Sequence, residues 1–410
     1  MNQINELDKR IIQLSDQFEQ DVLTLRRAIH ENPELSFQEV HTAALVQQAL
    51  ENIGLTVKCG IARTGLIADI HGSKPGRTLL LRADMDALPI QEQNDLPFRS
   101  KKDSVMHACG HDVHTANLVG VARILYELRD SWSGTIRLVF QPAEENGGGG
   151  REMIRAGILD DIPIDASIAL HTMSTAEPGH FSLGWGNVTA YSDKFSIIVH
   201  GQKTHSAQPQ DGVDAIAIAA QIITAINSIL LKNIDPMDRA TYSIGTIQGG
   251  VAPNVVPDQV EMCGMMRNIT AQTREILREK ISTTAEGIAH ALGGSAEFLF
   301  TEGYSSVYND PTLTDFVAKQ IQDKSSFWLQ GIESKPEAEE WLMREVRPIL
   351  GAEDYGFYTQ RVPSCFYRVA TGDSAPAHSP HFLVQEPYIK LCTRSMSSLA
   401  INYLVKFSQI

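Results

Sequence analysis

Hydrophobic positions recur at helical spacing in several stretches of the N-terminal half. Residues 5–30 and 41–54 are two such stretches, and Gly54 is expected to end the second. A third follows Asp112, which we expect to be its N-cap. Short apolar runs typical of buried strands lie between and after them: GLIADI, TLLLRADM, GTIRLVFQP and ASIALH, the last ending on His171. Alternating strands and helices predict an α/β domain with a largely parallel sheet.

A different order of elements begins near residue 187. Four segments are typical of strands (KFSIIVHG, ATYSIGTIQGG, QVEMCGMMRNI, SAEFLFTEGY) and two of helices (GVDAIAIAAQIITAINSILL, TREILREKISTTAEGIAHALG). Their order is strand, helix, strand, strand, helix, strand, which is the two-layer ferredoxin-like arrangement. The sequence therefore predicts a discontinuous α/β domain of residues 1–186 and 303–410, with a smaller α+β domain of residues 187–302 inserted into it.

Length, composition and charge narrow the class of protein. A chain of 410 residues is expected to form more than one domain, and its 43% hydrophobic residues include no run long enough to span a membrane. The net charge is −14 without a Lys/Arg block, which argues against nucleic acid or an anionic membrane as partner. The polar N-terminus lacks the apolar core of a signal peptide, and the five scattered cysteines suit free thiols. We therefore expect a soluble cytoplasmic protein.

Candidate ligands for a metal follow several of the expected strands. Cys109 and His111 lie in MHACGHDVHTANLVG, Glu144 and Glu145 follow TIRLVF, His171 ends SIALH, and His378 lies in AHSPHF. Functional groups of α/β sheets gather past the C-terminal strand ends. Each histidine alone is more often a hydrogen-bonding or exposed residue. Together, however, a thiolate, imidazoles and a carboxylate are the ligand types that bind Zn, Mn, Co or Ni.

The adjacent glutamates suggest a hydrolytic reaction. One carboxylate can bind a metal while the other faces the open coordination position and takes a proton from the water that the metal activates. The alternative for EEN is an ordinary acidic helix start. The glycines that follow could also suggest a phosphate loop, but they lack the Lys-Ser/Thr pair of a nucleotide site and the G-x-G-x-x-G spacing.

Six motifs occur along the chain in this order: HENPELSFQE, LLLRADMDALPI, HACGHDVHTA, FQPAEENGGG, NVVPD and HSPHF. In these motifs the chain resembles a family of metal-dependent amidohydrolases. That family includes hippurate hydrolase, plant auxin-conjugate hydrolases and bacterial N-acyl-amino-acid deacylases, and is related more distantly to aminoacylase and carboxypeptidase G. The resemblance implies a zinc-peptidase-like α/β catalytic domain, with the inserted domain as a lid that also makes a homodimer.

The resemblance implies two divalent metal ions per subunit, with Mn, Zn, Co and Ni all possible. Cys109 would bridge the ions, and Glu144 would be the general base and then the acid that protonates the leaving amine. Asp86 would orient a ligating histidine. The remaining ligands would be His111, Glu145, His171 and His378. Three further matching residues are interpreted as loop-fixing or capping, and His381 as a bystander; the three are His107, Asp112 and His114.

The resemblance extends to the inserted domain. His205 matches a lid histidine that reaches a partner subunit's site and stabilises the oxyanion. Asn254 and Arg267 match positions associated with the substrate carboxylate or amide, and Arg suits a bidentate carboxylate contact. The alternative for Arg267 is a surface arginine on a strand. The lid motif departs from the family's in ways that bear on the lid loop and substrate preference more than on the chemistry: Lys203 and Thr204 replace two glycines, and Gln210 replaces a histidine.

The leading hypothesis is metal-dependent hydrolysis of the amide bond of an N-acyl amino acid, which gives a carboxylic acid and a free amino acid. A dipeptidase or carboxypeptidase on the same site is the nearest alternative, because both cleave an amide beside a carboxylate. A metal-binding protein without catalysis is disfavoured by the intact Glu144 and the full ligand set. A dehydrogenase is disfavoured by the missing dinucleotide fingerprint.

Overall fold

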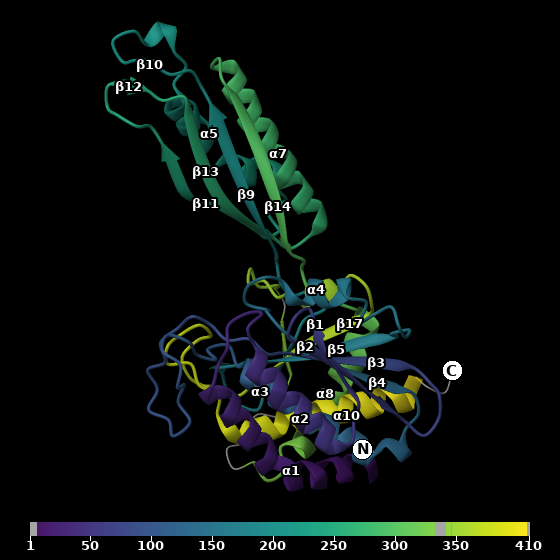
Figure 1. Ribbon diagram of the computed structural model, residues 1–410. Coiled ribbons are helices and arrows are strands. Elements are labelled where there is room, and N and C mark those ends of the chain that lie inside the picture. Colours follow the sequence, from purple (N-terminus) through teal and green to yellow (C-terminus); the bar gives the residue numbers. More distant parts are fainter. Residues whose placement is uncertain (1–5, 333–341, 346, 408–410) are drawn as a thin grey trace. The chain divides into compact units, whose positions relative to one another are not determined.

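The computed structural model describes residues 6–332, 342–345 and 347–407. The chain forms two compact units (Figure 1). Unit 1 consists of Met1–Gly186, Tyr308–Arg347 and Asp354–Ile410, and unit 2 consists of Asn187–Val307 and Pro348–Glu353. Unit 2 therefore reaches beyond residue 302, where the sequence analysis set its end, and takes in a short second segment that the sequence pattern did not single out.

Unit 1 is built on an eight-stranded sheet in the order β1-β2-β4-β3-β5-β17-β7-β16. Its centre is parallel, because β4, β3, β5 and β17 pair in that direction, as do β7 and β16. The pairs β1–β2, β2–β4 and β17–β7 are antiparallel, so the sheet is mixed rather than largely parallel. The strands are β1 (Val57–Ile61), β2 (Gly65–His71), β3 (Thr78–Asp84), β4 (Thr135–Gln141), β5 (Ala166–Met173), β7 (Phe181–Leu183), β16 (Leu342–Arg344) and β17 (Ser364–Ala370).

Helices cover the sheet of unit 1. Helices α1, α3 and α10 contact one another, α2 contacts α3, and α8 contacts α10. Figure 1 shows these helices on one side of the sheet and α4 on the other, where α4 contacts α9. The helices are α1 (Glu6–Glu31), α2 (Val40–Ile53), α3 (His111–Glu127), α4 (Gly149–Arg155), α8 (Pro311–Trp328), α9 (Gly356–Thr359) and α10 (Ile389–Phe407).

The central strands are apolar because helices cover them. Every residue of β3 is buried, and Leu79, Leu81, Leu138 and Phe140 are fully enclosed in the main core. The short elements of unit 1 and its connections are β6 (Thr175–Ala176), β8 (Gly186–Asn187), β15 (Tyr308–Asn309), β18 (Gly372–Asp373), η1 (Arg129–Ser131) and η3 (Glu386–Tyr388).

The ends of three predicted elements in unit 1 can be compared with the structure. Gly54 ends α2 as predicted, with φ of 99° and its N–H bonded to the last turn. The prediction for Asp112 was wrong, because α3 begins at His111 and Gly110 occupies the N-cap position. Strand β5 does not end on His171 but continues to Met173, since its pairing with β17 continues that far.

Unit 2 has the predicted two-layer arrangement. Its four-stranded sheet has the order β11-β13-β9-β14 with antiparallel pairing throughout, and α5 and α7 contact each other and the sheet. The first predicted helix of this domain, GVDAIAIAAQIITAINSILL, is divided after Ile226 by a short break. The elements are β9 (Tyr191–His200), β10 (Thr204–His205), η2 (Pro209–Asp211), α5 (Ala215–Ile226), α6 (Ile229–Asn233), β11 (Ala240–Gly249), β12 (Val255–Val256), β13 (Gln259–Asn268), α7 (Ala271–Ala291) and β14 (Ser295–Tyr304).

Strict alternation along β13 explains the two layers of unit 2. Val260, Met262 and Met266 are buried against the helices, whereas Gln259, Glu261 and Met265 are exposed on the other face.

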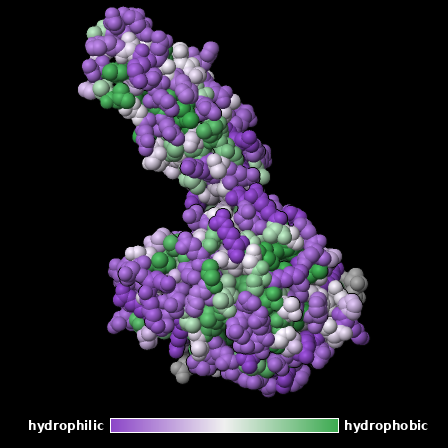
Figure 2. All heavy atoms as spheres, in the orientation of Figure 1, coloured by the Kyte–Doolittle hydropathy of each residue, from purple (hydrophilic) through white to green (hydrophobic). Residues whose placement is uncertain are grey.

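In the described residues, no helix is both long enough and apolar enough to cross a membrane. Figure 2 shows that hydrophilic side chains cover most of the visible face of each unit, with smaller hydrophobic areas between them.

Candidate metal centre

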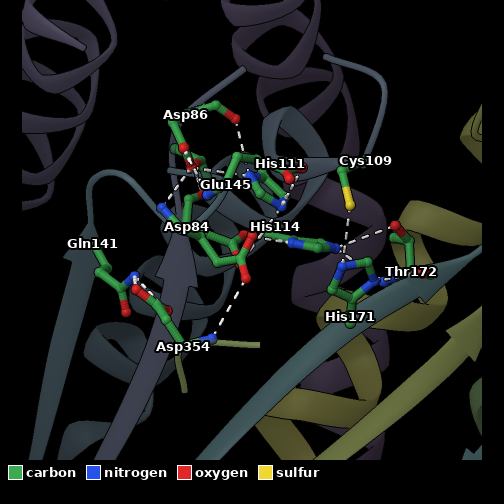
Figure 3. Close-up of polar contacts among 12 residues, drawn as sticks. Asp84, Asp86, Cys109, His111, His114, Gln141, Glu145, His171, Thr172 and Asp354 are labelled. Carbon is green, nitrogen blue, oxygen red and sulfur yellow. Dashed lines mark hydrogen bonds and ion pairs between the residues drawn. The ribbon is translucent and has the colours of Figure 1, made fainter. Parts of the chain in front are cut away.

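The candidate ligands of unit 1 converge from separate elements. Cys109 lies just before α3, and His111 is the first residue of that helix. His171 belongs to β5, and Glu145 follows β4. The potential ligand atoms of Cys109, His111 and His171 all lie within 4.8 Å of one another, as do those of Cys109, Glu145 and His378. Figure 3 shows how Cys109, His111, His171 and Glu145 face a common centre.

The rings of His111 and His171 are oriented by backbone carbonyls. His171 Nδ1 lies 2.6 Å from the carbonyl oxygen of Thr172, and His111 Nδ1 lies 2.9 Å from that of Asp86. Because a carbonyl only accepts, each Nδ1 donates, which leaves each Nε2 as the ligand atom. His171 Nε2 lies 3.5 Å from Cys109 Sγ.

Two buried atoms at this centre are incompletely satisfied in the described part of the chain. His111 Nε2 has no hydrogen-bond partner there, and Glu145 Oε1, 3.9 Å from it, has only the ion-pair contact with His378 Nε2 at 3.3 Å. Buried polar atoms are normally hydrogen-bonded, so these two atoms beside a thiol suit the binding of a cation. The donor set of sulfur, imidazole nitrogen and carboxylate oxygen fits a divalent transition metal.

Asp86 organises the loop that carries the two glutamates. Its carboxylate accepts the backbone N–H groups of Glu144 and Glu145, each at 3.0 Å, and the hydroxyl of Ser36 at 2.7 Å. It also lies 3.2 Å from His111 Nδ1. One buried carboxylate thus connects the glutamate loop to the start of α3.

Glu144 lies beside Glu145 and is 7% exposed. A carboxylate oxygen of each lies within 4.8 Å of a ring nitrogen of His111. The backbone N–H of Asp354 donates to Glu144 Oε1 at 3.4 Å. Glu144 is therefore next to the ligand group and is held from a second element, as a proton-transfer group requires.

Burial dominates the electrostatics of the site. It raises the pKa of the Cys109 thiol to about 12 and holds the pKa of His171 well below its ordinary value. Burial also opposes charge on His111, but Asp84, Cys109 and Asp86 raise its pKa well above the ordinary value. The Glu145 carboxylate raises the pKa of the half-exposed His378. A dicationic ion would reverse the first effect by binding the thiolate.

Unusual backbone conformations occur on both sides of the site. Ala143, just before Glu144, has φ of 55°, and His378 has φ of 67°. Positive φ is uncommon for residues other than glycine and is concentrated at functional sites. The backbone N–H of each residue makes a hydrogen bond. Ala143 N–H donates to the carboxylate of Glu39 at 2.9 Å, and His378 N–H donates to the carbonyl of Ala108 at 2.8 Å.

Comparison with known proteins decides the family. Residues 80–402 match Peptidase family M20/M25/M40. The chain belongs to this family. That range contains each of the candidate ligands and both glutamates, so the matched region includes the complete site.

Relatives of this M20-family chain are enzymes that act on amides. It is 38% identical over 391 residues to thermostable carboxypeptidase 1 of Saccharolobus solfataricus, covering 93% of this chain and 95% of the relative. It is 41% identical over 302 residues to an N-acyl-L-amino acid amidohydrolase of Geobacillus stearothermophilus, covering 73% and 81%. A Bacillus subtilis structure described as a dinuclear metal binding peptidase of the M20 family matches with a TM-score of 0.82 at 33% identity, covering 95% and 99%. The M20-family chain is a hydrolase of amide bonds.

Four further residues of the MHACGHDVHTANLVG and AHSPHF segments have distinct environments. The carboxylate of Asp112 accepts a hydrogen bond from Arg26 Nε at 2.7 Å and lies 2.8 Å from His30 Nδ1. Asp112 therefore attaches the start of α3 to α1 instead of capping α3. His107 is 1% exposed and neither ring nitrogen has a partner within the described residues; burial lowers its pKa to about 3. His114 is buried beside Asp84, and His381 is exposed.

Several residues that shape the site had no role in the sequence analysis. Arg26 and His30 bind Asp112, Ser36 binds Asp86, and Glu39 binds the Ala143 turn. Arg26 and His30 lie near the end of α1, Ser36 and Glu39 lie between α1 and α2, and all four are in or near the HENPELSFQE motif. That motif was the available signal, but it carried no spacing that would have indicated which distant partner each side chain binds.

The three predicted residues of unit 2 lie apart from this cluster in the sequence and belong to two places in that unit. His205 and Asn254 are exposed neighbours, since β10 pairs with β12 and the N–H of Ser206 donates to the carbonyl of Asn254 at 3.0 Å. Arg267 lies on β13, where Nη1 donates to the carbonyl of Leu350 at 2.9 Å.

The departures in the lid motif have local partners. Lys203 Nζ lies 3.1 Å from a carboxylate oxygen of Asp258, and the hydroxyl of Thr204 donates to the carbonyl of Gln208 at 3.3 Å. Gln210 lies in the short helix η2. The side chains of Lys203 and Thr204 thus make contacts that two glycines at these positions could not make.

Proposed function

We propose that this M20-family hydrolase cleaves the amide bond of N-acyl amino acids and releases a carboxylic acid and a free amino acid. The observation that carries the proposal is that Glu144 and Glu145 both lie at the cluster of potential ligand atoms that includes His111. One carboxylate faces the ligand group and the other lies next to it. The name of the Geobacillus relative supports the same substrate class.

Two divalent ions per chain would be held by Cys109, His111, Glu145, His171 and His378, with Cys109 shared. When bound, such ions supply a water of lowered pKa and polarise the scissile carbonyl. Glu144 accepts the proton of the attacking water and returns it to the leaving amine. Asp86 fixes the position of His111 relative to Glu144 and Glu145 through its contacts with the ring and with the two backbone N–H groups. The chemistry of the donor set suits Mn, Zn, Co or Ni.

Unit 2 is proposed to act as the lid and as the contact surface of a homodimer. The N–H of Ala207 donates to His205 Nδ1 at 3.1 Å, so the neutral ring carries its proton on the exposed Nε2. That N–H is a suitable donor to an oxyanion in a partner subunit's site. Asn254 and Arg267 would bind the amide and carboxylate of the substrate; one bond to Leu350 does not exhaust the five donors of a guanidinium. The five free cysteines support a cytoplasmic location.

Metal-dependent release of amine tests the reaction. Chelated protein is refilled with Mn, Co, Ni or Zn and incubated with N-acyl amino acids and dipeptides. We expect release from the N-acyl panel only after metal is returned. Release from no substrate, by protein that binds about two ions per chain, would contradict the proposal and favour a metal-binding protein without catalysis.

Glu144→Gln tests the proton-transfer role. The variant should retain both ions but lose at least about 100-fold in kcat, because general acid–base groups contribute about 10²–10⁴-fold. Glu152→Gln, a half-exposed glutamate of α4 that pairs with Arg155, is the matched control and should be as active as the wild type. Unchanged kcat in Glu144→Gln would exclude this mechanism.

A carboxypeptidase or dipeptidase is the second candidate. The specific observation in its favour is the 38% identity to a carboxypeptidase over nearly the whole chain. The same substrate panel separates the two, since a peptidase would release amine faster from dipeptides than from N-acetyl or N-aroyl amino acids of the same C-terminal residue.

A further inference from the structure

A buried ion pair that the metal assignment does not use lies next to the candidate centre. Arg82 and Asp84 are at the end of β3, and His114 is in the first turn of α3; all three are at most 1% exposed. Arg82 Nη1 donates to Asp84 Oδ2 at 2.5 Å, and Asp84 Oδ1 lies 2.6 Å from His114 Nδ1. Burying three ionisable groups is costly, so their arrangement calls for a role.

The hydrogen bonds assign the proton on the His114 ring. The backbone N–H of Thr172 donates to His114 Nε2 at 2.9 Å, so this nitrogen carries a lone pair. The hydroxyl of Thr172 lies 3.2 Å from the same nitrogen. The ring proton is therefore on Nδ1, where it is donated to Asp84. Asp84 fixes the tautomer in which His114 can accept the Thr172 N–H.

The backbone of Thr172 in turn orients His171. Its carbonyl accepts the proton of His171 Nδ1 at 2.6 Å, and its N–H belongs to the peptide bond that joins the two residues. With both groups held, His171 Nε2 points at Cys109 Sγ. Figure 3 shows His114 next to Thr172 and His171, on the side of the centre opposite Asp86.

A third cation site is the alternative use of these side chains, since ligand atoms of Asp84, His111 and His114 lie within 4.8 Å of one another. The atoms are already engaged. Asp84 Oδ2 binds Arg82, Asp84 Oδ1 binds His114, and His114 Nε2 accepts Thr172 N–H. Asp84 thus accepts from Arg82 and from the His114 ring, as the proposed tautomer requires.

We propose that Asp84 and His114 are positioning residues that hold the Thr172 backbone and thereby aim His171 Nε2 at the metal centre. The inference rests on the proposed function, because it assumes that His171 binds metal. Neither residue touches the ions or the substrate. Their contribution is to reduce the freedom of a ligand before the ion arrives, as partners behind ligating histidines do in other metal sites.

Two substitutions of His114 separate the contacts. In His114→Gln the side-chain oxygen reaches the place of Nε2 and can accept Thr172 N–H. In His114→Asn the shorter amide can donate to Asp84 but does not reach Thr172. Metal-free protein is titrated with Co²⁺, and thiolate-to-cobalt absorbance and bound metal are recorded. We expect His114→Asn to weaken one of the two ions by about 10–100-fold and to change the absorbance, while His114→Gln stays within about 3-fold of the wild type.

Each outcome decides the inference. Wild-type Co²⁺ affinity and absorbance in His114→Asn would overturn it, and so would equal weakening in the two variants, because the acceptor for Thr172 N–H would then be irrelevant. Hydrolysis of the N-acyl panel is measured separately on the wild type. Failure there, with the cobalt result as expected, would refute the proposed function and leave the positioning role intact.

A measurement without a destabilising variant covers the case in which His114→Asn does not fold. In metal-free protein labelled with ¹⁵N-histidine, the His114 ring should appear in the Nδ1–H form at neutral pH, and its signal is identified by its absence from His114→Gln. The Nε2–H form would overturn the inference, since such a ring cannot accept the Thr172 N–H.

Discussion

Gly110 separates the candidate ligands Cys109 and His111 and has φ of 90°, a conformation that other L residues rarely adopt. A Cβ at this position would lie 2.3 Å from Thr172 Oγ1. We therefore expect Gly110→Ala to cost about 1–3 kcal/mol in the free energy of unfolding and to impair metal binding, because the strained turn presents both ligands. Urea unfolding and metal titration measure the two effects.

Gly287 in α7 is the matched control, since a Cβ there would meet no atom within 4 Å. Gly287→Ala should leave stability unchanged or raise it by about 0.5–1 kcal/mol, as expected for glycine in a helix interior. Equal effects of the two substitutions would contradict the assigned role of the Gly110 turn.

Asp161 provides a pH-dependent contribution to the stability of unit 1. The bond from Arg137 lowers the pKa of this carboxyl from 3.8 to about 2. A carboxylate with a depressed pKa stabilises the fold fully above its unfolded value, and the contribution is lost as the pH falls through its folded value. Asp161→Asn should therefore be less stable than the wild type by about 0.5–1 kcal/mol at pH 7, a modest effect because the side chain is 40% exposed.

The difference between Asp161→Asn and the wild type should shrink between about pH 4 and pH 2, as the unfolded carboxyl takes up its proton first. Urea unfolding at a series of pH values measures this trend. Asp160→Asn removes a carboxylate from an exposed pair with Arg361 and serves as control over the same pH series. A difference that grows towards low pH would refute the assignment.

The chemistry of single residues could be predicted from the sequence where it depends on side-chain type. Cys109, His111, Glu145 and His171 gather as expected because parallel strands deliver their C-terminal ends to one edge. The supporting contacts could not be predicted, because they join residues far apart in the chain with no pattern between them. Arg26 and Asp112 are 86 positions apart, and either could have been an ordinary surface charge.

At the scale of elements, α1 is attached to the start of α3 by a buried ion pair as well as by its apolar face. Arg26 is 1% exposed and binds the buried Asp112, whereas the neighbouring Arg27 is 41% exposed and binds Glu386. Removing Arg26 leaves a buried carboxylate without its main cation. We expect Arg26→Leu to cost about 3–5 kcal/mol in the free energy of unfolding.

Arg27→Leu is the control for Arg26→Leu, because its ion pair with Glu386 is partly exposed and a solvent-accessible pair contributes only about 0–1 kcal/mol. Both variants lose a bond to Glu386, so the difference between them reports the buried pair with Asp112. Urea unfolding of both proteins provides the comparison, and similar losses in the two variants would show that the buried pair is not what fixes α1.

Periodic elements were predictable and their ends less so. The amphipathic patterns of α1, α2 and α7 and the alternation of β13 reproduce the predicted elements, because one face of each is buried. The sequence favours Asp112 as a cap, but ion pairing with Arg26 and His30 outweighs local capping there. The direction of strand pairing depends on connections across the whole chain. The sequence analysis therefore did not predict that β1, β2 and β7 pair in the antiparallel direction.

At the scale of the whole molecule, each unit has a hydrophobic core of its own. The core of unit 2 includes Phe195, Ile222, Met262 and Ile281, which are fully buried between its sheet and its two long helices. A domain with a separate core can fold alone. The chain enters and leaves unit 2 twice, because Pro348–Glu353 also belongs to it.

We therefore expect a fragment of residues 187–307 to fold cooperatively but to be less stable than unit 2 in the full chain. The fragment lacks the partners that the second segment supplies to Arg239 and Arg267, whose guanidinium groups donate to Pro348 and Leu350 at 2.6 and 2.9 Å. Each lost hydrogen bond to a charged group is expected to cost about 1.5–3 kcal/mol, reduced by the hydrogen bonds that water then makes to the guanidinium.

Urea unfolding of the fragment, followed by far-UV circular dichroism, should show one transition. Ile281→Ala should lower the free energy of unfolding of the fragment by about 2–5 kcal/mol, as truncation of a core side chain does. A fragment without a cooperative transition, or one indifferent to Ile281→Ala, would mean that the core of unit 2 is not sufficient without Pro348–Glu353 or the rest of the chain.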